Sequence, residues 1–296
     1  MRAAVVSSFG GPEAVEIVEV ALPEPGARQV RIKVAAAGVN PVDAGVRAGV
    51  FGGAGKRLGL GWDVAGVVEA VGVASGWNVG DEVVALAYGT AKNLGTHADL
   101  VVVDADAVAA APRSVDVVHA ASLPLNALTA AQALDRLGLE PGQNLLITGA
   151  AGAVGGYAVQ LAARLGVSVT ALARAGDEEL VRSLGADRFV SGGVAPRSVD
   201  AVLDAAILGA DALDWVRDGG AFMGVIPGAH PASVRGVRTS AVEVAADGAR
   251  LAELVALVDE GALTTRVAGT YALDEAVKAH ARLAEGGLRG RLVLVP

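Results

Sequence analysis

A glycine-rich loop in the middle of the chain has the spacing of a site for nucleotide phosphates. It reads Gly149-Ala-Ala-Gly152-Ala-Val-Gly155, between an apolar run at 145–147 and a helical pattern at 153–165, and a second apolar run follows at 167–172. The order strand, tight turn, helix, strand is typical of the first half of a nucleotide-binding βαβ unit. Glycines there let the backbone approach a pyrophosphate, whose charge lies at the N–H groups and positive end of the helix. We expect the phosphates to bind at Gly149, Ala150, Gly152, Ala153, Val154 and Gly155.

The residues after the second apolar run indicate which dinucleotide binds. A site for NAD usually has Asp or Glu at this point, which accepts hydrogen bonds from the ribose hydroxyls. This chain has Ala173-Arg174 instead. An arginine can hold a 2′-phosphate through charge-assisted, bidentate hydrogen bonds, so the sequence predicts NADP(H) as the cofactor. The alternative is a surface arginine that pairs with Asp177, Glu178 or Glu179.

The composition excludes several classes of protein. The 296 residues are 53% hydrophobic but only 3% aromatic, which suits parallel strands of Ala, Val and Leu covered by helices. A formal charge of -8 without a basic run argues against nucleic acid as a partner. The absence of cysteine excludes disulfides, thiolate zinc sites and a cysteine nucleophile. The N-terminal residues alternate like a strand, and the weakly charged region 117–134 is interrupted by polar residues and a proline, so we expect no signal peptide, no membrane span and a cytoplasmic protein.

The pattern of predicted secondary structure changes along the chain. Short β-like runs separated by glycine and proline fill residues 1–110, which predicts an antiparallel barrel. Strands that alternate with helices follow, and these predict a doubly wound parallel sheet; a terminal strand at 290–296 is expected to rejoin the barrel. We therefore predict an α/β protein with a substrate-side domain at 1–116 and 262–296 and an NADP(H)-binding Rossmann domain at 117–261.

Several short motifs are spread along the chain. They are Gly38-Val-Asn40-Pro41-Val-Asp43 with Arg47-Ala-Gly49, Leu60-Gly-Trp62-Asp63-Val-Ala-Gly66-Val-Val-Glu69-Ala-Val-Gly72, Val79-Gly80-Asp81-Glu82-Val83, Gly95-Thr-His97-Ala98-Asp99, Leu123-Pro124-Leu-Asn126-Ala-Leu-Thr129-Ala130, Leu184-Gly185-Ala186-Asp187 and Gly290-Arg291-Leu-Val-Leu. Together they resemble the zinc-independent quinone oxidoreductases of the medium-chain dehydrogenase/reductase superfamily. The resemblance spans nearly the whole chain. It implies that the substrate-side domain is a GroES-like β-barrel, and that the active site is expected in the cleft between this barrel and the Rossmann domain.

The chain departs from this family's relatives at informative positions. Zinc-dependent relatives carry a Gly-His-Glu block where this chain has Gly61-Trp62-Asp63, and with no cysteine in the chain we expect no zinc site. Large aromatic residues common in the family are replaced by Gly45, Ala131 and Gly192, which predicts a wide substrate pocket.

The expected chemistry is conjugate reduction. Without a metal, little polarises a simple ketone, whereas an enone or quinone accepts hydride at carbon and spreads the charge to an enolate oxygen that a few hydrogen-bond donors stabilise. The candidate catalytic residues are Asn40, Thr129 and His97, and the resemblance also implies that Thr129 and Arg291 lie near the cofactor. Tyr88 and Lys92 lie in a glycine-containing stretch at 88–95, a candidate lid.

Each candidate also has a plainer interpretation. Asn40 before a proline can be a turn residue, Thr129 can cap a helix, and His97 can be structural. His119, His230 and His280 show no constellation of partners and receive no role.

Three functions fit these observations. The first is an NADPH-dependent reductase of quinones or α,β-unsaturated carbonyl compounds. The second is a tailoring enoyl reductase specific for one bulky biosynthetic intermediate. The third is an NADPH-binding sensor, scaffold or cyclisation protein without redox turnover. The resemblance also implies a homodimer whose subunits meet along the outer strands of their nucleotide-binding sheets. The alternating run at 233–239 follows the last clear strand of the Rossmann pattern, and pairing across a two-fold axis would cover such an edge.

Overall fold

The computed structural model describes residues 1–90 and 92–296. Residue 91, within the predicted lid stretch, lies outside the described residues. The chain forms two compact units. Unit 1 comprises Met1–Leu125, Ala245–Gly261 and Thr265–Pro296, and unit 2 comprises Asn126–Val244 and Ala262–Thr264. The predicted boundaries after residues 116 and 261 stay a prediction, because compactness alone does not define where a domain folds.

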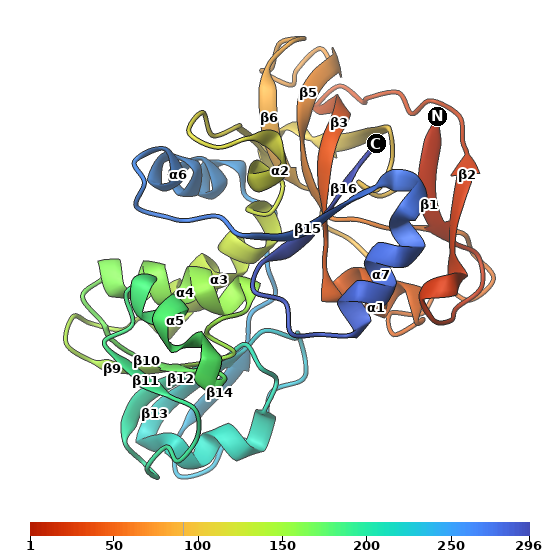
Figure 1. The fold of residues 1–296 in the computed structure, drawn as a ribbon. Helices are drawn as coiled ribbons and strands as arrows, with labels where there is room; N and C mark the ends of the chain where they lie inside the picture. Colours follow the sequence, from red (N-terminus) through yellow and green to blue (C-terminus); the bar gives the residue numbers. More distant parts are fainter. Residues whose placement is uncertain (91) are drawn as a thin grey trace. The chain divides into compact units, whose positions relative to one another are not determined.

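Unit 1 is built on mostly antiparallel strands (Figure 1). The larger sheet runs β15 (Val267–Ala272), β16 (Arg291–Val295), β3 (Gln29–Val39), β5 (Asp63–Val71), β6 (Glu82–Leu86) and β8 (Val108–Ala110), with β7 (Leu100–Asp104) also on β3. A smaller sheet has the order β2 (Val15–Glu19), β1 (Arg2–Val6), β4 (Leu58–Gly59). The terminal strand β16 pairs antiparallel with β3, so it rejoins the N-terminal strands as predicted.

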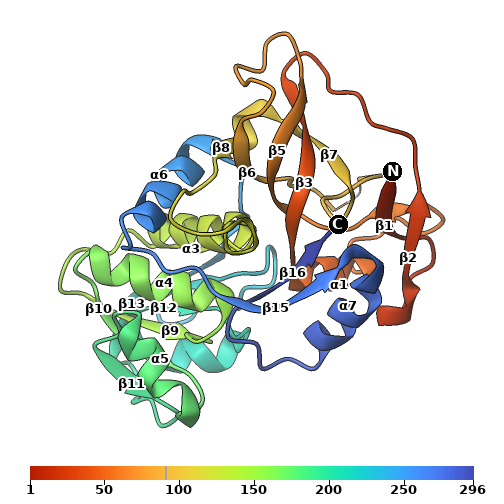
Figure 2. The same ribbon diagram turned by 45° about the horizontal axis from the view of Figure 1, so that its top comes forward.

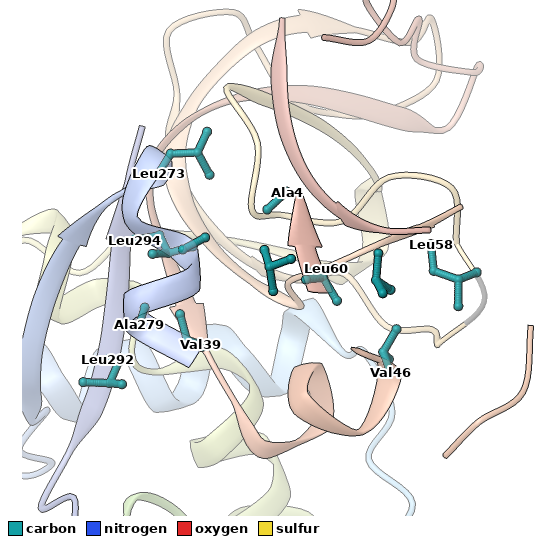
Figure 3. Packing of buried hydrophobic residues seen from close by; sticks show 12 residues of the cluster. Ala4, Val39, Val46, Leu58, Leu60, Leu273, Ala279, Leu292 and Leu294 are labelled. Carbon is teal, nitrogen blue, oxygen red and sulfur yellow. The ribbon is translucent and has the colours of Figure 1, made fainter. Parts of the chain in front are cut away.

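Unit 1 also contains the helices α1 (Pro41–Arg47), α2 (Val117–Ala120), α6 (Gly248–Asp259) and α7 (Ala276–Ala284). Two of them, α1 and α7, contribute to one apolar core. Figure 3 shows Val46 from α1, Leu58 from β4 and Ala279 from α7 in a core shared with Val39 and Leu292. The burial of these apolar side chains holds α1 and α7 against the strands that position the polar residues described below.

Unit 2 contains a six-stranded sheet in which every pair is parallel. Its order is β11 (Arg188–Val190), β10 (Ser168–Leu172), β9 (Asn144–Thr148), β12 (Val199–Asp204), β13 (Val216–Gly224), β14 (Arg238–Ala241). The chain winds outward in both directions from β9 and β12, so the predicted doubly wound Rossmann sheet is confirmed. Helices α4 (Ala153–Arg164) and α5 (Glu178–Ser183) follow β9 and β10, and α4 packs on both of these strands (Figure 2).

Helix α3 (Pro124–Leu137) was not expected from the sequence. Most of its residues are buried, so polar residues do not recur at the helical spacing that would have indicated a helix in the sequence. Helix α6 was expected among the Rossmann elements, but it packs against β8 within unit 1. Within the described residues, no helix has the length and apolarity that a bilayer crossing needs.

Candidate functional site

The glycine loop lies at the carboxyl end of β9 and opens α4 within unit 2. Gly149 has a φ of +59°, in the left-handed region that favours glycine. A Cβ on Gly155 would lie 2.2 Å from the Gly149 carbonyl oxygen, so only glycine lets the helix approach the turn this closely. Gly152, with extended backbone, is the N-cap of the 12-residue α4, and its N–H donates to the Gly149 carbonyl at 2.8 Å. The first N–H groups of α4 are therefore presented beside a tight turn, an arrangement that fits a pyrophosphate.

Buried polar side chains hold the strand ends next to this loop. The Thr148 hydroxyl donates to the Asp204 carboxylate at 2.6 Å and accepts the Ala206 N–H at 2.9 Å. The other Asp204 oxygen accepts the Gly209 N–H at 2.8 Å. These bonds join the carboxyl ends of β9 and β12, between which the direction of winding reverses. Ligands of open α/β sheets bind at such a point.

Arg174 follows β10 and is exposed to solvent. None of the described residues forms an ion pair with it, and Glu178 accepts instead from Arg182, at 2.8 Å. The predicted alternative, pairing with Asp177, Glu178 or Glu179, is therefore not observed in the described part of the chain. The guanidinium is available to a 2′-phosphate, and with the glycine loop it completes a set of groups that fits NADP(H).

In unit 1, Asn40 and Asp43 connect α1 to the neighbouring strands. Asn40 is the N-cap of α1, with Pro41 as its first residue. The Asn40 N–H donates to one Asp43 oxygen at 2.7 Å, and the Gly61 N–H donates to the other at 2.8 Å. Asn40 is thus a helix-capping residue, which refines the interpretation of a simple turn.

The Asn40 side chain reaches Asp63 at the start of β5. Its amide nitrogen donates to the Asp63 carboxylate at 2.6 Å, and the second Asp63 oxygen accepts the Leu125 N–H at 2.6 Å. Both side chains are fully buried. Desolvation raises the pKa of Asp63 to about 6, although the hydrogen bonds from Leu125 and Asn40 and the charge of Arg291 oppose the shift. Asn40 therefore orders a buried carboxylate that titrates close to neutral pH.

The raised pKa of Asp63 predicts how stability depends on pH. The folded protein holds this proton up to about pH 6, whereas an unfolded chain releases it near pH 3.9, so folding takes up a proton between these values. The unfolding free energy should therefore rise as the pH falls through 6. Between pH 7.5 and pH 4.5 we expect wild type to gain about 2 kcal/mol relative to Asp63→Asn, measured by urea unfolding at each pH. Parallel pH profiles for the two proteins would contradict the assignment.

The comparison with Asp63→Asn is needed because His280 changes the unfolding free energy in the opposite direction as the pH falls. Burial, with the nearby charges of His97 and Arg47, lowers the pKa of His280 to about 3, so this side chain disfavours folding in acid. That contribution is common to both proteins and cancels in the difference.

His97 is buried in unit 1. Its Nε2 lies 2.9 Å from the Gly38 carbonyl oxygen, which can only accept, so this nitrogen carries the hydrogen and donates. The Nδ1 atom has no hydrogen-bond partner among the described residues, and Nε2 is 4.0 Å from Asp43. The predicted role in proton transfer stays a prediction, and this geometry favours the structural interpretation.

The two residues predicted to lie near the nicotinamide belong to different units. Thr129 lies inside α3 in unit 2, so it does not cap that helix, and it is buried. Arg291 begins β16 in unit 1, donates from Nη1 to the Val39 carbonyl at 3.2 Å and acts electrostatically on Asp63. The contact of either residue with a cofactor stays a prediction.

The positions that lack large aromatic residues differ in their surroundings. A Cβ on Gly45 would lie 2.9 Å from the Phe51 ring, so Phe51 fills the space beside this glycine. Ala131 is buried within α3, and Gly192 lies on an exposed turn with open space around it. The predicted widening of the pocket therefore has no support at position 45.

The structure also identifies polar residues that sequence reasoning passed over. Asp43, Asp63, Thr148 and Asp204 are all buried at strand or helix ends. Thr148 and Asp204 are single polar residues at the end of an apolar run, which is a weak signal in the sequence. Asp43 and Asp63 stand in motifs that carry the family resemblance, but their partners are distant in the sequence.

Comparisons with known proteins agree with this architecture. Residues 26–113 match the family model for the alcohol dehydrogenase GroES-like domain, and residues 175–294 match the model described as zinc-binding dehydrogenase. An Arabidopsis thaliana protein named NADPH-dependent alkenal/one oxidoreductase is 33% identical over 100% of this chain and 80% of its own length. A quinone oxidoreductase from Coxiella burnetii superposes with a TM-score of 0.87 at 28% identity, over 100% of this chain and 99% of its own. A mycobacterial protein solved in complex with NADPH superposes with a TM-score of 0.85 at 28% identity, over 100% of both chains.

Proposed function

The chain belongs to the quinone oxidoreductase and alkenal/one oxidoreductase family of the medium-chain dehydrogenase/reductase superfamily, and from this premise we propose that it reduces quinones or α,β-unsaturated carbonyl compounds with NADPH. The observation that carries the proposal is the combination of the glycine loop with Arg174 after β10, which is exposed and has no ion-pair partner in the described part of the chain. The named activity of the Arabidopsis relative and the NADPH in the mycobacterial structure support the same choice of cofactor. A cytoplasmic location and a homodimer remain predictions. The edge strand of the sheet is β14 (Arg238–Ala241), which overlaps the run 233–239 predicted to pair only at residues 238 and 239.

When bound, the cofactor supplies a hydride from its nicotinamide ring. The Gly149–Gly155 loop and the start of α4 would hold the pyrophosphate, and Arg174 would hold the 2′-phosphate. Asn40 orders Asp63 through its amide, and Thr129 offers a hydroxyl. Neither Asn40 nor Thr129 titrates near neutral pH, so they act by positioning rather than by proton transfer. We expect each alanine variant to lose about ten- to a hundredfold in kcat/KM.

The position of the added hydrogen tests the reaction. With 4-deuterated NADPH and a simple enone, deuterium is expected at the β carbon of the product, because the enolate spreads the charge that a carbonyl reduction would leave on one oxygen. NMR or mass spectrometry of the product gives the result. Deuterium on the carbinol carbon would mean carbonyl reduction and would overturn the proposal.

Turnover is expected to be independent of zinc, although one matched family model is described as zinc-binding. At the Gly61-Trp62-Asp63 position, both Asp63 oxygens accept N–H groups, and the described residues contain no group of three or more His, Cys, Asp or Glu that could hold a metal. Prolonged dialysis against a chelator should leave activity unchanged, and elemental analysis should find no stoichiometric zinc. Activity lost to the chelator and restored by zinc would contradict this expectation.

The other two candidate functions give different results. A tailoring enoyl reductase should ignore simple quinones and enones, and a sensor or scaffold should bind NADPH tightly without oxidising it. A panel of generic acceptors, with NADPH affinity measured in parallel, separates the three. The tailoring function was suggested in part by the predicted wide pocket. Phe51 fills the space beside Gly45, so this position does not support a wide pocket.

A further inference from the structure

A lysine lies beside the buried carboxylates of unit 1. The Lys92 side chain belongs to a half-buried residue, and its ammonium donates to the Ala87 carbonyl and lies 5.4 Å from the centre of the Trp62 ring. The Tyr88 ring packs edge-on against the same indole, with ring centres 5.0 Å apart. A cation over an indole face is held by the ring quadrupole, so the aromatic pair gives Lys92 a defined place.

Burial favours loss of a proton from the Lys92 ammonium, although nearby carboxylates oppose it. Burial lowers the pKa of Lys92 to about 8, while the negative charges of Asp43 on α1 and Asp63 on β5 oppose the shift. Both carboxylates already accept N–H groups from the backbone or from Asn40. The ammonium has three N–H groups, and Ala87 is its acceptor within the described residues. Lys92 therefore has N–H groups available to another acceptor.

We propose that Lys92 is the proton donor that completes the reduction. The proposal rests on the function proposed above. Hydride transfer from bound NADPH would break a C4–H bond of its nicotinamide, leave NADP⁺ and form a C–H bond at the β carbon, so that the substrate becomes an enolate. The Nζ–H bond of Lys92 then breaks, its proton forms the new C–H bond at the α carbon, and the neutral amine recovers a proton from water. With a quinone, the same proton would go to an oxygen of the hydroquinone anion.

The other polar groups of unit 1 are less suited to this step. The His97 Nε2–H is committed to the Gly38 carbonyl, and the ring is buried. The Asn40 amide donates to Asp63 and does not titrate. Among these groups, Lys92 combines partial exposure, an available N–H and a proton affinity suited to general acid catalysis near neutral pH.

The titration of Lys92 can be measured without turnover. The chain has only four lysines, Lys33, Lys56, Lys92 and Lys278, so reductive ¹³C-methylation gives a sparse NMR spectrum. The Lys92 signal is assigned by its loss in Lys92→Arg. We expect it to titrate near pH 8, and to shift lower in Asp63→Asn because a negative charge is lost. A midpoint above pH 10 would overturn the proposal.

Enone reduction by two variants tests the chemical role. In wild type, kcat should fall as the pH rises through about 8, and it should show a solvent isotope effect. Lys92→Met should lose about a hundredfold in kcat at pH 7. Its kcat should also no longer fall as the pH rises through 8. Lys92→Arg keeps the cation over Trp62 but holds its proton throughout, so it should be slow with a flat alkaline profile. Lys278→Met, at an exposed lysine paired with Glu275, is the control and should behave like wild type.

The outcomes separate the two proposals. If wild type reduces no quinone or enone, the proposed function fails, and the role of Lys92 fails with it. If wild type is active and both Lys92 variants, folded by circular dichroism, keep its rate and its pH profile, the role of Lys92 alone is overturned.

Discussion

Gly155→Ala is expected to weaken NADPH binding by at least about a hundredfold. The new Cβ would lie 2.2 Å from the Gly149 carbonyl oxygen and 2.8 Å from its carbon, so the turn and the start of α4 must separate. Each charge-assisted hydrogen bond to a phosphate that is lost costs about 1.5–3 kcal/mol, or about ten- to a hundredfold in affinity, and the displacement affects more than one. Strain from the added methyl should also lower the unfolding free energy by about 1–3 kcal/mol. Calorimetric titration with NADPH and thermal unfolding give the two values.

A matched glycine in the same sheet provides the control for this variant. A Cβ on Gly224 would meet the Ala241 side chain at 3.6 Å, an ordinary contact, so Gly224→Ala should bind NADPH like wild type. If folded Gly155→Ala also binds NADPH with wild-type affinity, the loop does not hold the pyrophosphate.

Arg174→Ala is expected to reduce the affinity for NADPH about ten- to a hundredfold and to leave NADH binding unchanged. The guanidinium is exposed and has no ion-pair partner among the described residues, so a 2′-phosphate competes with water alone for its donors. A charge-assisted contact of this kind contributes about 1.5–3 kcal/mol. The measurement is the ratio of the two dissociation constants in wild type and variant.

Two further variants make this result specific. Arg174→Lys keeps the charge but loses the planar fork, and should fall between wild type and Arg174→Ala. Arg182→Ala removes an exposed arginine that pairs with Glu178 on α5, and should leave the ratio unchanged. If Arg174→Ala also leaves the ratio unchanged, Arg174 is a surface residue and the preference for NADPH has another source.

The glycine loop and Arg174 illustrate what the sequence alone could determine. A tight turn between a strand and a helix depends on backbone freedom at a few consecutive residues, so Gly149, Gly152 and Gly155 predict it without knowledge of the rest of the fold. The alternation of strands and helices is likewise a local pattern. It was enough to predict the parallel sheet of unit 2 and the antiparallel strands of unit 1.

The polar cluster of unit 1 was decided by the tertiary structure. Asn40 was chosen from its motif, but its partner Asp63 lies 23 residues away, and Asp63 in turn bonds Leu125 across 62 residues. The place of Lys92 over Trp62 likewise depends on how the loop after β6 folds back. The spacing of hydrophobic residues along a helix or strand indicates which of its faces is buried. It does not indicate which distant element covers that face. The pKa values of Asp63 and Lys92 depend on that burial and on the charges brought near them, so they could be obtained only from the folded chain.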